Sequence, residues 1–155
     1  MSADITVVAP VTGTVITMAE VPDPVFSAEL VGPGLAIDPD PVLGRDVRSP
    51  IDGTVVKLHP HAFVVQAADG RGVLVHLGIN TVQLDGQGFS LTVAEGDQVA
   101  AGQVLIQWDI EAIAETGRSV ICPVVALDAK PDAIDLHAAP GSHVTSESTL
   151  LEWGA

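Results

Sequence analysis

Two short motifs each occur twice in this sequence, and their repetition restricts the fold more than any other feature. A Pro-x-x-Gly-Thr-Val unit begins at Pro10 and again at Pro50. A longer Gly-x-x-Val-x-x-x-x-x-Leu-x-x-Trp unit begins at Gly96 and again at Gly141. Two copies are too few for a solenoid, which needs several stacked repeats to build its core. The repeats instead predict two similar β-rich halves, related by duplication, that pack on each other around a pseudo-twofold axis.

The composition favours short strands joined by tight turns. The chain is 47% hydrophobic and only 17% charged, against a usual charged share of about a quarter. Valine recurs between many glycines and prolines, which is typical of strands and turns. Strands are expected at residues 5–8, 14–18, 35–38, 46–48, 53–58, 62–67, 72–77, 90–93, 104–108, 119–125 and 150–153.

Two short helices complete the predicted fold. Asp109 is a good N-cap for a helix that runs to Thr116, with Gly117 at its end. A second helix is expected within residues 131–137. We therefore predict an all-β, antiparallel sandwich or barrel built from two similar halves, with one or two short helices, in a single domain over residues 1–155.

Charge and cysteine content narrow the function classes. The chain carries 20 acidic and 6 basic residues, a net charge of −14, which disfavours binding to nucleic acid or to an anionic membrane. The acidity indicates either a partner with a basic docking patch or a need for solubility. The single cysteine, Cys122, is expected to be buried and inert. The sequence lacks a signal peptide and any apolar run of about 18 residues, so we expect a cytoplasmic protein that does not insert into membranes.

A predicted β-hairpin carries two histidines, His61 and His76, around an Asp-Gly turn signal. A turn centred on residues 68–69 would place His61 opposite His76, and one centred on residues 69–70 would make them diagonal neighbours. Side chains alternate along strands, so both registers put the histidines on one face, with Cβ atoms roughly 4.5–8 Å apart. A three-residue turn or a bulge would separate them.

Such a pair of imidazoles has three uses. A neutral imidazole can accept a phosphoryl group, while its neighbour hydrogen-bonds the phosphate oxygens. Two imidazoles are also half of a zinc coordination shell. Finally, both can be structural residues of a half-buried sheet. The hairpin alone leaves these uses open.

The motifs around the hairpin resemble the glucose-family enzyme IIA domain of the bacterial sugar phosphotransferase system. The most specific part is the run His-x-Gly-Ile-x-Thr-Val-x-Leu-x-Gly-x-Gly-Phe over residues 76–89. Pro-Ile-Asp-Gly-Thr at 50–54, His-Ala-Phe at 61–63 and Gly-Asp-Gln-Val at 96–99 match in the same order. The resemblance covers almost the whole chain, and residues 58–65 are similar to the actinobacterial branch.

The resemblance implies a phosphohistidine relay. The phosphocarrier HPr, charged from phosphoenolpyruvate by enzyme I, would pass its phosphoryl group to Nε2 of His76. His61 would hold the phosphate, which would then move to a cysteine of the IIB domain of a IIB/IIC permease and on to the sugar. We expect no cofactor and no catalytic metal, and zinc at His61 and His76 would be adventitious or regulatory. The sequence does not determine the oligomeric state, and a monomer is the default expectation.

Further positions take roles from the same resemblance. Phe26, Leu74 and Val75 match an apolar docking rim around the active histidine, and Asp23 matches an acidic position that meets basic side chains of HPr.

At two positions the sequence departs from the family. His59 stands where the family usually has a threonine that orients the active imidazole, so His59 is the candidate for that role. Asn80 stands at a partner-contact position where aspartate is common.

Three other function classes share features with this sequence. A zinc peptidase of related β-fold would use the His59-Pro60-His61 pair, but it also needs an upstream His-x-x-x-Asp pair, and no histidine precedes His59. A biotinyl or lipoyl carrier needs a lysine at the tip of a hairpin. The residues that flank Lys57 and Lys130 do not fit such a tip. A regulatory IIA-like binding module, which senses phosphorylation without serving a permease, stays open.

Overall fold

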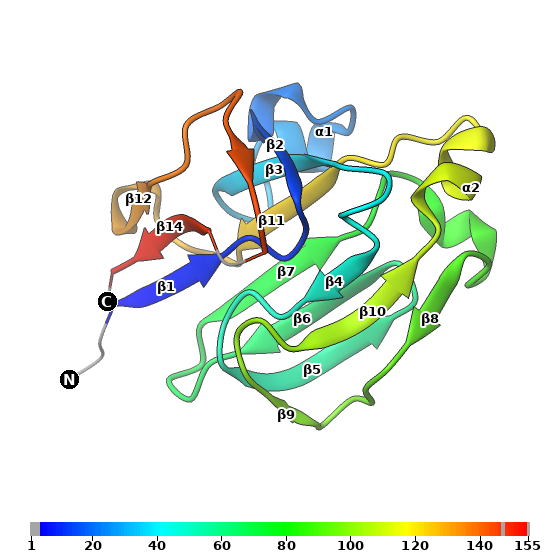
Figure 1. Ribbon diagram of the computed structural model, residues 1–155. Helices are drawn as coiled ribbons and strands as arrows, with labels where there is room; N and C mark the ends of the chain where they lie inside the picture. Colours follow the sequence, from blue (N-terminus) through cyan, green and yellow to red (C-terminus); the bar gives the residue numbers. More distant parts are fainter. Residues whose placement is uncertain (1–3, 147, 155) are drawn as a thin grey trace.

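Fourteen strands form three antiparallel sheets in the computed structural model, which describes residues 4–146 and 148–154 (Figure 1). The largest sheet has the order β13 (His143–Val144), β2 (Gly13–Thr17), β3 (Gly34–Pro39), β11 (Cys122–Ala126), β7 (Gly72–His76), β6 (Ala62–Gln66), β5 (Gly53–His59) and β9 (Gln98–Val99). One small sheet has the order β1 (Ile5–Val8), β14 (Thr149–Trp153) and β12 (Ile134–Leu136). The other has the order β4 (Asp46–Arg48), β10 (Val104–Trp108) and β8 (Phe89–Leu91).

The duplicated motifs form equivalent parts of this architecture. Gly13 of β2 pairs with Val144 of β13, and Gly53 of β5 pairs with Val99 of β9. A Cβ at either glycine would meet a backbone carbonyl oxygen of the strand on its other side, so both repeats require glycine at this position. The two small sheets have matching strand orders as well. The prediction of two similar halves is confirmed.

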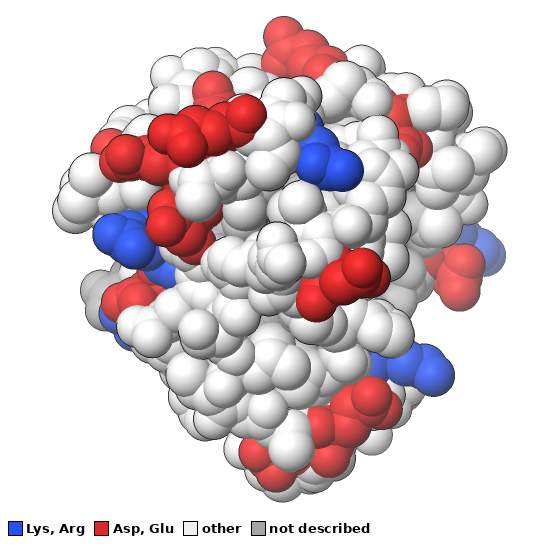
Figure 2. Space-filling view, turned by 90° about the vertical axis from the view of Figure 1, so that its right-hand side faces the viewer, with Lys and Arg blue, Asp and Glu red and all other residues white. Residues whose placement is uncertain are grey.

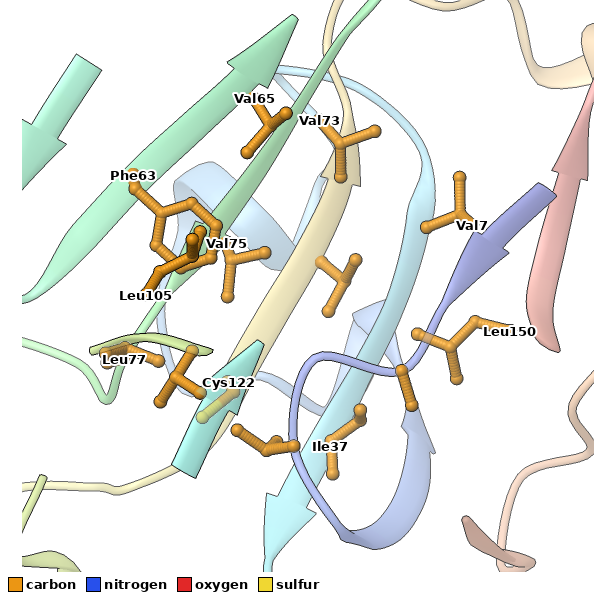
Figure 3. Close-up of a cluster of buried hydrophobic side chains, with 14 of the residues drawn as sticks. Val7, Ile37, Phe63, Val65, Val73, Val75, Leu77, Leu105, Cys122 and Leu150 are labelled. Atoms are coloured by element: carbon orange, nitrogen blue, oxygen red, sulfur yellow. The ribbon is translucent and has the colours of Figure 1, made fainter. Parts of the chain in front are cut away.

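The core lies between the inner face of the large sheet and the two small sheets, which gives a sandwich rather than a closed barrel. Figure 3 shows Phe63 of β6 and Val75 of β7 pointing into this cluster beside Leu105, while Leu150 lies at its other side near Val7. Leu105 and Leu150 come from the two copies of the longer motif. Cys122 is fully buried there, and burial raises the pKa of its thiol. The expected inert environment of this thiol is therefore present.

The helices match the prediction in part. Helix α2 (Ile110–Glu115) begins after Asp109, whose side chain accepts a hydrogen bond of 3.2 Å from the backbone N–H of Ala112, and Gly117 follows with a φ of 85°. The predicted helix at 131–137 is wrong beyond its first turn. The 3₁₀ helix η3 (Pro131–Ala133) is followed at once by β12, because the chain there pairs with β14.

Some elements were not foreseen from the sequence. These are helix α1 (Pro24–Ser27), the 3₁₀ helices η1 (Met18–Glu20) and η2 (Thr81–Leu84), and strands β9, β12 and β13. Strands β9 and β13 have two residues each, too short for an alternating pattern. Strand β11 begins at Cys122 rather than at the expected residue 119.

Many acidic side chains of the sequence lie on the surface. On the face shown in Figure 2, acidic side chains outnumber basic ones and lie in several separate groups. Within the described part of the chain, no helix is long and apolar enough to cross a membrane.

Candidate functional site

His76 is the last residue of β7 and lies on the outer face of the large sheet, opposite Ala62 of β6. The hairpin register matches neither expected alternative. The hairpin closes around Asp69, the backbone N–H of Ala67 donates to the carbonyl of Arg71, and His61 thereby comes opposite Leu77 instead of His76. The prediction of the register from strand alternation is therefore wrong.

The two imidazoles nevertheless meet. His61 lies with Pro60 in the turn between β5 and β6, outside both strands, so strand alternation does not set the direction of its side chain. The ring centroids of His61 and His76 are 5.2 Å apart in an edge-on arrangement. His59 stacks on His61, with its ring centroid 5.7 Å from that of His61 and an interplanar angle of 27°.

The orientation of His76 is set by a backbone carbonyl. Its Nδ1 lies 2.6 Å from the carbonyl oxygen of Gly78. A carbonyl only accepts hydrogen bonds, so Nδ1 carries the hydrogen, and in the neutral ring Nε2 carries the lone pair. The expectation that His59 takes the orienting role finds no support in these contacts, because His59 stacks on His61. The sequence signal for the carbonyl is the glycine two residues after the histidine, where φ is 79°.

Phe26 forms one wall of the site. It comes from α1, which begins after Asp23, and the Asp23 carboxylate accepts a hydrogen bond of 2.9 Å from the backbone N–H of Val25. The Phe26 ring is tilted by 60° against His76 at a centroid distance of 5.3 Å and is only 8% exposed. It belongs to a second apolar cluster with Met18, Val21, Ala36, Ile79 and Val125. Phe26 therefore packs on the histidine more than it faces the solvent.

The environment keeps both histidines neutral. Burial lowers the pKa of His76, although its hydrogen bond to Gly78 and the charge of Asp23 act in the opposite direction. Burial lowers the pKa of His61 to about 4, and its neighbours His76 and His59 add to this shift. At neutral pH each ring therefore has one lone pair and one N–H.

The remaining predicted residues divide between the surface and the core. Leu74 is half-buried on the same face as His76 and lines a hollow of about 210 Å³ that also includes Lys57 and His59. Val75 has 0% exposure and points into the core, so its expected place in a docking rim is wrong; one step along a strand reverses the face. Asn80 is exposed, with a φ of 62°, and its carbonyl accepts from Arg118 at 3.2 Å.

Some exposed apolar residues of this region were missed by the sequence analysis. Val25 of α1 is 42% exposed, and Val82 of η2 is 58% exposed. Val25 directly precedes Phe26 in the chain, and Val82 lies two residues after Asn80. No alternating or helical pattern marks either one, because each lies in a single helical turn.

Two further observations concern other ligands. Among residues 4–146 and 148–154, no group of three or more His, Cys, Asp or Glu side chains is placed to hold a metal ion. A hollow of about 670 Å³ lies elsewhere, next to the stacked pair Phe89 and Trp108. None of the residues that surround His76 lines it.

Comparison with known proteins gives a consistent result. Residues 5–131 match the family model described as phosphoenolpyruvate-dependent sugar phosphotransferase system, EIIA 1. The glucose-specific EIIA component of Bacillus cereus is 45% identical over 122 residues, which are 77% of this chain and 72% of the relative. That of Oceanobacillus iheyensis is 43% identical over 124 residues, which are 79% of this chain and 73% of the relative. The solved structure of glucose permease IIA from Mycoplasma capricolum has a TM-score of 0.86 and 31% identity, and covers 97% of this chain and 96% of its own.

Proposed function

Because the chain belongs to the EIIA 1 family of the phosphoenolpyruvate-dependent sugar phosphotransferase system, we propose that it carries the phosphoryl group on Nε2 of His76. The chain is a phosphoryl carrier in sugar uptake. The observation that supports His76 as the carrying residue is its hydrogen bond of 2.6 Å to Gly78, which fixes the ring and leaves the lone pair on Nε2.

The chemistry requires a positioned, neutral nucleophile. The Nε2 lone pair attacks the phosphorus of the phosphorylated donor. A P–N bond forms on His76 as the bond to the donor breaks, and the donor keeps the electron pair. His76 becomes positively charged in this step, and its Nδ1–H, held by the Gly78 carbonyl, stabilises that charge. Such a relay needs positioning and charge stabilisation more than covalent machinery.

His61 is proposed to hold the transferred phosphate. Its ring lies 5.2 Å from that of His76 and is neutral at pH 7, so it offers one N–H to a phosphate oxygen. Two negative charges on the phosphoryl group would also favour protonation of His61, which would add a charge-assisted hydrogen bond.

The partners follow from the family. We propose that HPr is the donor and that a cysteine of a IIB domain is the acceptor. Its thiolate attacks phosphorus, and the electron pair returns to Nε2 of His76. Glucose is the proposed sugar, since the curated relatives are glucose-specific components. The net charge of −14 suits partners with basic docking surfaces. The cytoplasm is the proposed compartment, because phosphoenolpyruvate is made there.

The test is phosphorylation with purified partners. The protein is incubated with labelled phosphoenolpyruvate, enzyme I and HPr, and we expect a phosphate that is labile in acid and stable in base. His76→Ala should abolish the label, whereas His143→Gln, at an exposed histidine in β13, should not reduce it. His61→Gln should accept the phosphate but fail to pass it on. Undiminished label on His76→Ala would contradict the assignment.

The alternatives have less support. The relatives are named as components of the transport system, which does not favour a purely regulatory module. A zinc peptidase is disfavoured because no third ligand accompanies the histidine pair within the described residues. Lys57 lies within β5 rather than at a hairpin tip, which argues against a biotinyl or lipoyl carrier.

A further inference from the structure

We propose that Thr81 is a positioning residue for the phosphoryl acceptor, acting through the backbone of Leu77 and Gly78. The inference rests on the proposed function of His76. It starts from burial: among the described residues only two polar side chains are buried, Ser49 at 0% and Thr81 at 1% exposure. Buried hydroxyls need a partner, and the partner of Thr81 lies one residue from His76 in the chain.

The carbonyl that holds His76 depends on two neighbouring peptide groups. The first joins Leu77 to Gly78: the Leu77 carbonyl accepts from the Thr81 hydroxyl at 2.7 Å, and the Gly78 N–H donates to the carbonyl of Ile121 at 3.1 Å. The second joins Gly78 to Ile79: its carbonyl accepts from Nδ1 of His76, and its N–H donates to Ser119 at 2.9 Å. Apart from the His76 ring itself, the Thr81 hydroxyl is thus the only side chain among the partners of these two peptide groups.

The Thr81 methyl group acts on the same segment. A Cβ built on Gly78 would lie 2.6 Å from Cγ2 of Thr81, so threonine fills the space beside the glycine and leaves no room for a larger residue there. Gly78 has a φ of 79°, in the left-handed region. The hydroxyl and the methyl group of Thr81 together hold the backbone conformation that directs the Gly78 carbonyl at His76.

Loss of the hydroxyl has a specific consequence. The Leu77 carbonyl belongs to a residue with 0% exposure, so water does not readily replace the lost donor. The first peptide then keeps only its hydrogen bond to Ile121, so its orientation is held less firmly and the Gly78 carbonyl shifts away from Nδ1 in a fraction of the molecules. His76 loses the contact that fixes its tautomer, and a fraction of the rings places the hydrogen on Nε2, which cannot attack phosphorus.

The test compares Thr81→Val, which keeps the shape without the hydroxyl, with Thr81→Ser, which keeps the hydroxyl. Ser49→Ala is the matched control, because the Ser49 hydroxyl is buried and also donates at 2.7 Å to a carbonyl, that of Ile51. We expect Thr81→Val to lower kcat for phosphorylation by phospho-HPr about ten- to a hundredfold. KM should be unchanged, since Thr81 is too buried to touch a partner. Thr81→Ser should restore most of kcat, and Ser49→Ala should keep it.

A second readout needs no partner protein. In ¹⁵N NMR spectra of the unphosphorylated protein, Thr81→Val should show the Nε2–H tautomer of His76 and a lower pKa for that ring, because the bond to Gly78 raises the pKa. If Thr81→Val does not fold, Thr81→Ser and Thr81→Ala are compared in the same way. A wild-type tautomer and kcat in the variants without the hydroxyl would overturn the role of Thr81. Failure of the wild-type protein to become labelled on His76 would instead overturn the proposed function.

Discussion

Replacing Phe26 by alanine tests both the packing and the electrostatics of the site. Burial of a phenylalanine typically contributes 3–5 kcal/mol relative to alanine. Phe26 is 8% exposed and belongs to the smaller of the two apolar clusters, so we expect a loss of about 3 kcal/mol in the free energy of unfolding. In a chain of this length that corresponds to a fall in Tm of about 6–12 °C. The variant should still fold at 25 °C, because domains are usually stable by about 5–15 kcal/mol.

The same change should alter His76. The Phe26 ring covers the imidazole at a centroid distance of 5.3 Å, and burial is the main cause that lowers the pKa of His76. Without the ring, water reaches the imidazole, so its pKa should rise toward the ordinary value of about 6.5. Phosphoryl acceptance should then fall more steeply as the pH drops below 7, because the protonated ring has no lone pair.

The assay is NMR titration of the imidazole together with urea unfolding. Phe89→Ala is the control, since Phe89 is half-buried and stacks on Trp108 at 6.0 Å, away from the histidines. It should destabilise the protein and leave the pKa of His76 unchanged. A Phe26→Ala protein with the wild-type pKa of His76 would show that other groups bury the ring, and the reasoning would fail.

Two further predictions concern stability. Gly78→Ala should lower the free energy of unfolding by about 2 kcal/mol or more, because its Cβ would meet both Thr81 and Ser119 at a positive φ; Gly70→Ala, with positive φ but open space, should cost less and keep phosphoryl acceptance. The pKa of His61 falls from 6.5 to about 4 on folding, so the unfolded chain binds more protons between these values. The contribution of neutral His61 to the free energy of unfolding should therefore be fully present above about pH 6.5 and be lost as the pH falls toward 4. Urea titrations of His61→Gln should show a weaker decline of the free energy of unfolding over this pH range.

Much of the architecture could be predicted because the duplicated motifs contain residue types that the backbone geometry requires. Gly13 and Gly53 occupy equivalent places where only glycine fits, and Asp109 caps its helix as expected. Strands β9 and β13 were not predicted, because a strand of two residues is too short to show an alternating pattern. Helix η3 stops after one turn because the next residues find a partner in β14, which no local pattern reveals.

The sequence predicted the two histidines of the site but not the way in which the backbone brings them together. The histidine pair follows from the sequence, yet the reason given for it, strand alternation across a two-residue turn, does not hold in the structure. His61 reaches His76 from a turn, and the direction of a turn side chain depends on backbone geometry rather than on a period. The orienting carbonyl of Gly78 is a backbone group whose one mark in the sequence is the glycine itself, whereas the family resemblance points to the side chain at position 59.

The duplication also explains why the molecule has one such site rather than two. Strands β2, β3 and β11 pair in the same way as β5, β6 and β7, so that Cys122 corresponds to Val73. Three residues further along each strand, Val125 corresponds to His76. Both point to the outer face of the large sheet, yet Val125 is fully buried and lies in the second apolar cluster.

The difference comes from the lengths of two connections. Strands β5 and β6 are joined by residues 60–61 alone, which leaves the outer face around His76 open. Strands β2 and β3 are joined by residues 18–33, and η1 and α1 within this segment cover the corresponding face of their own half. The same segment extends to the other half and places Phe26 on His76. In one half of the duplication, residues 18–33 thus bury Val125, the position that corresponds to His76. The same residues shield the imidazole of His76 in the other half. A symmetric fold therefore provides a single, partly desolvated nucleophile.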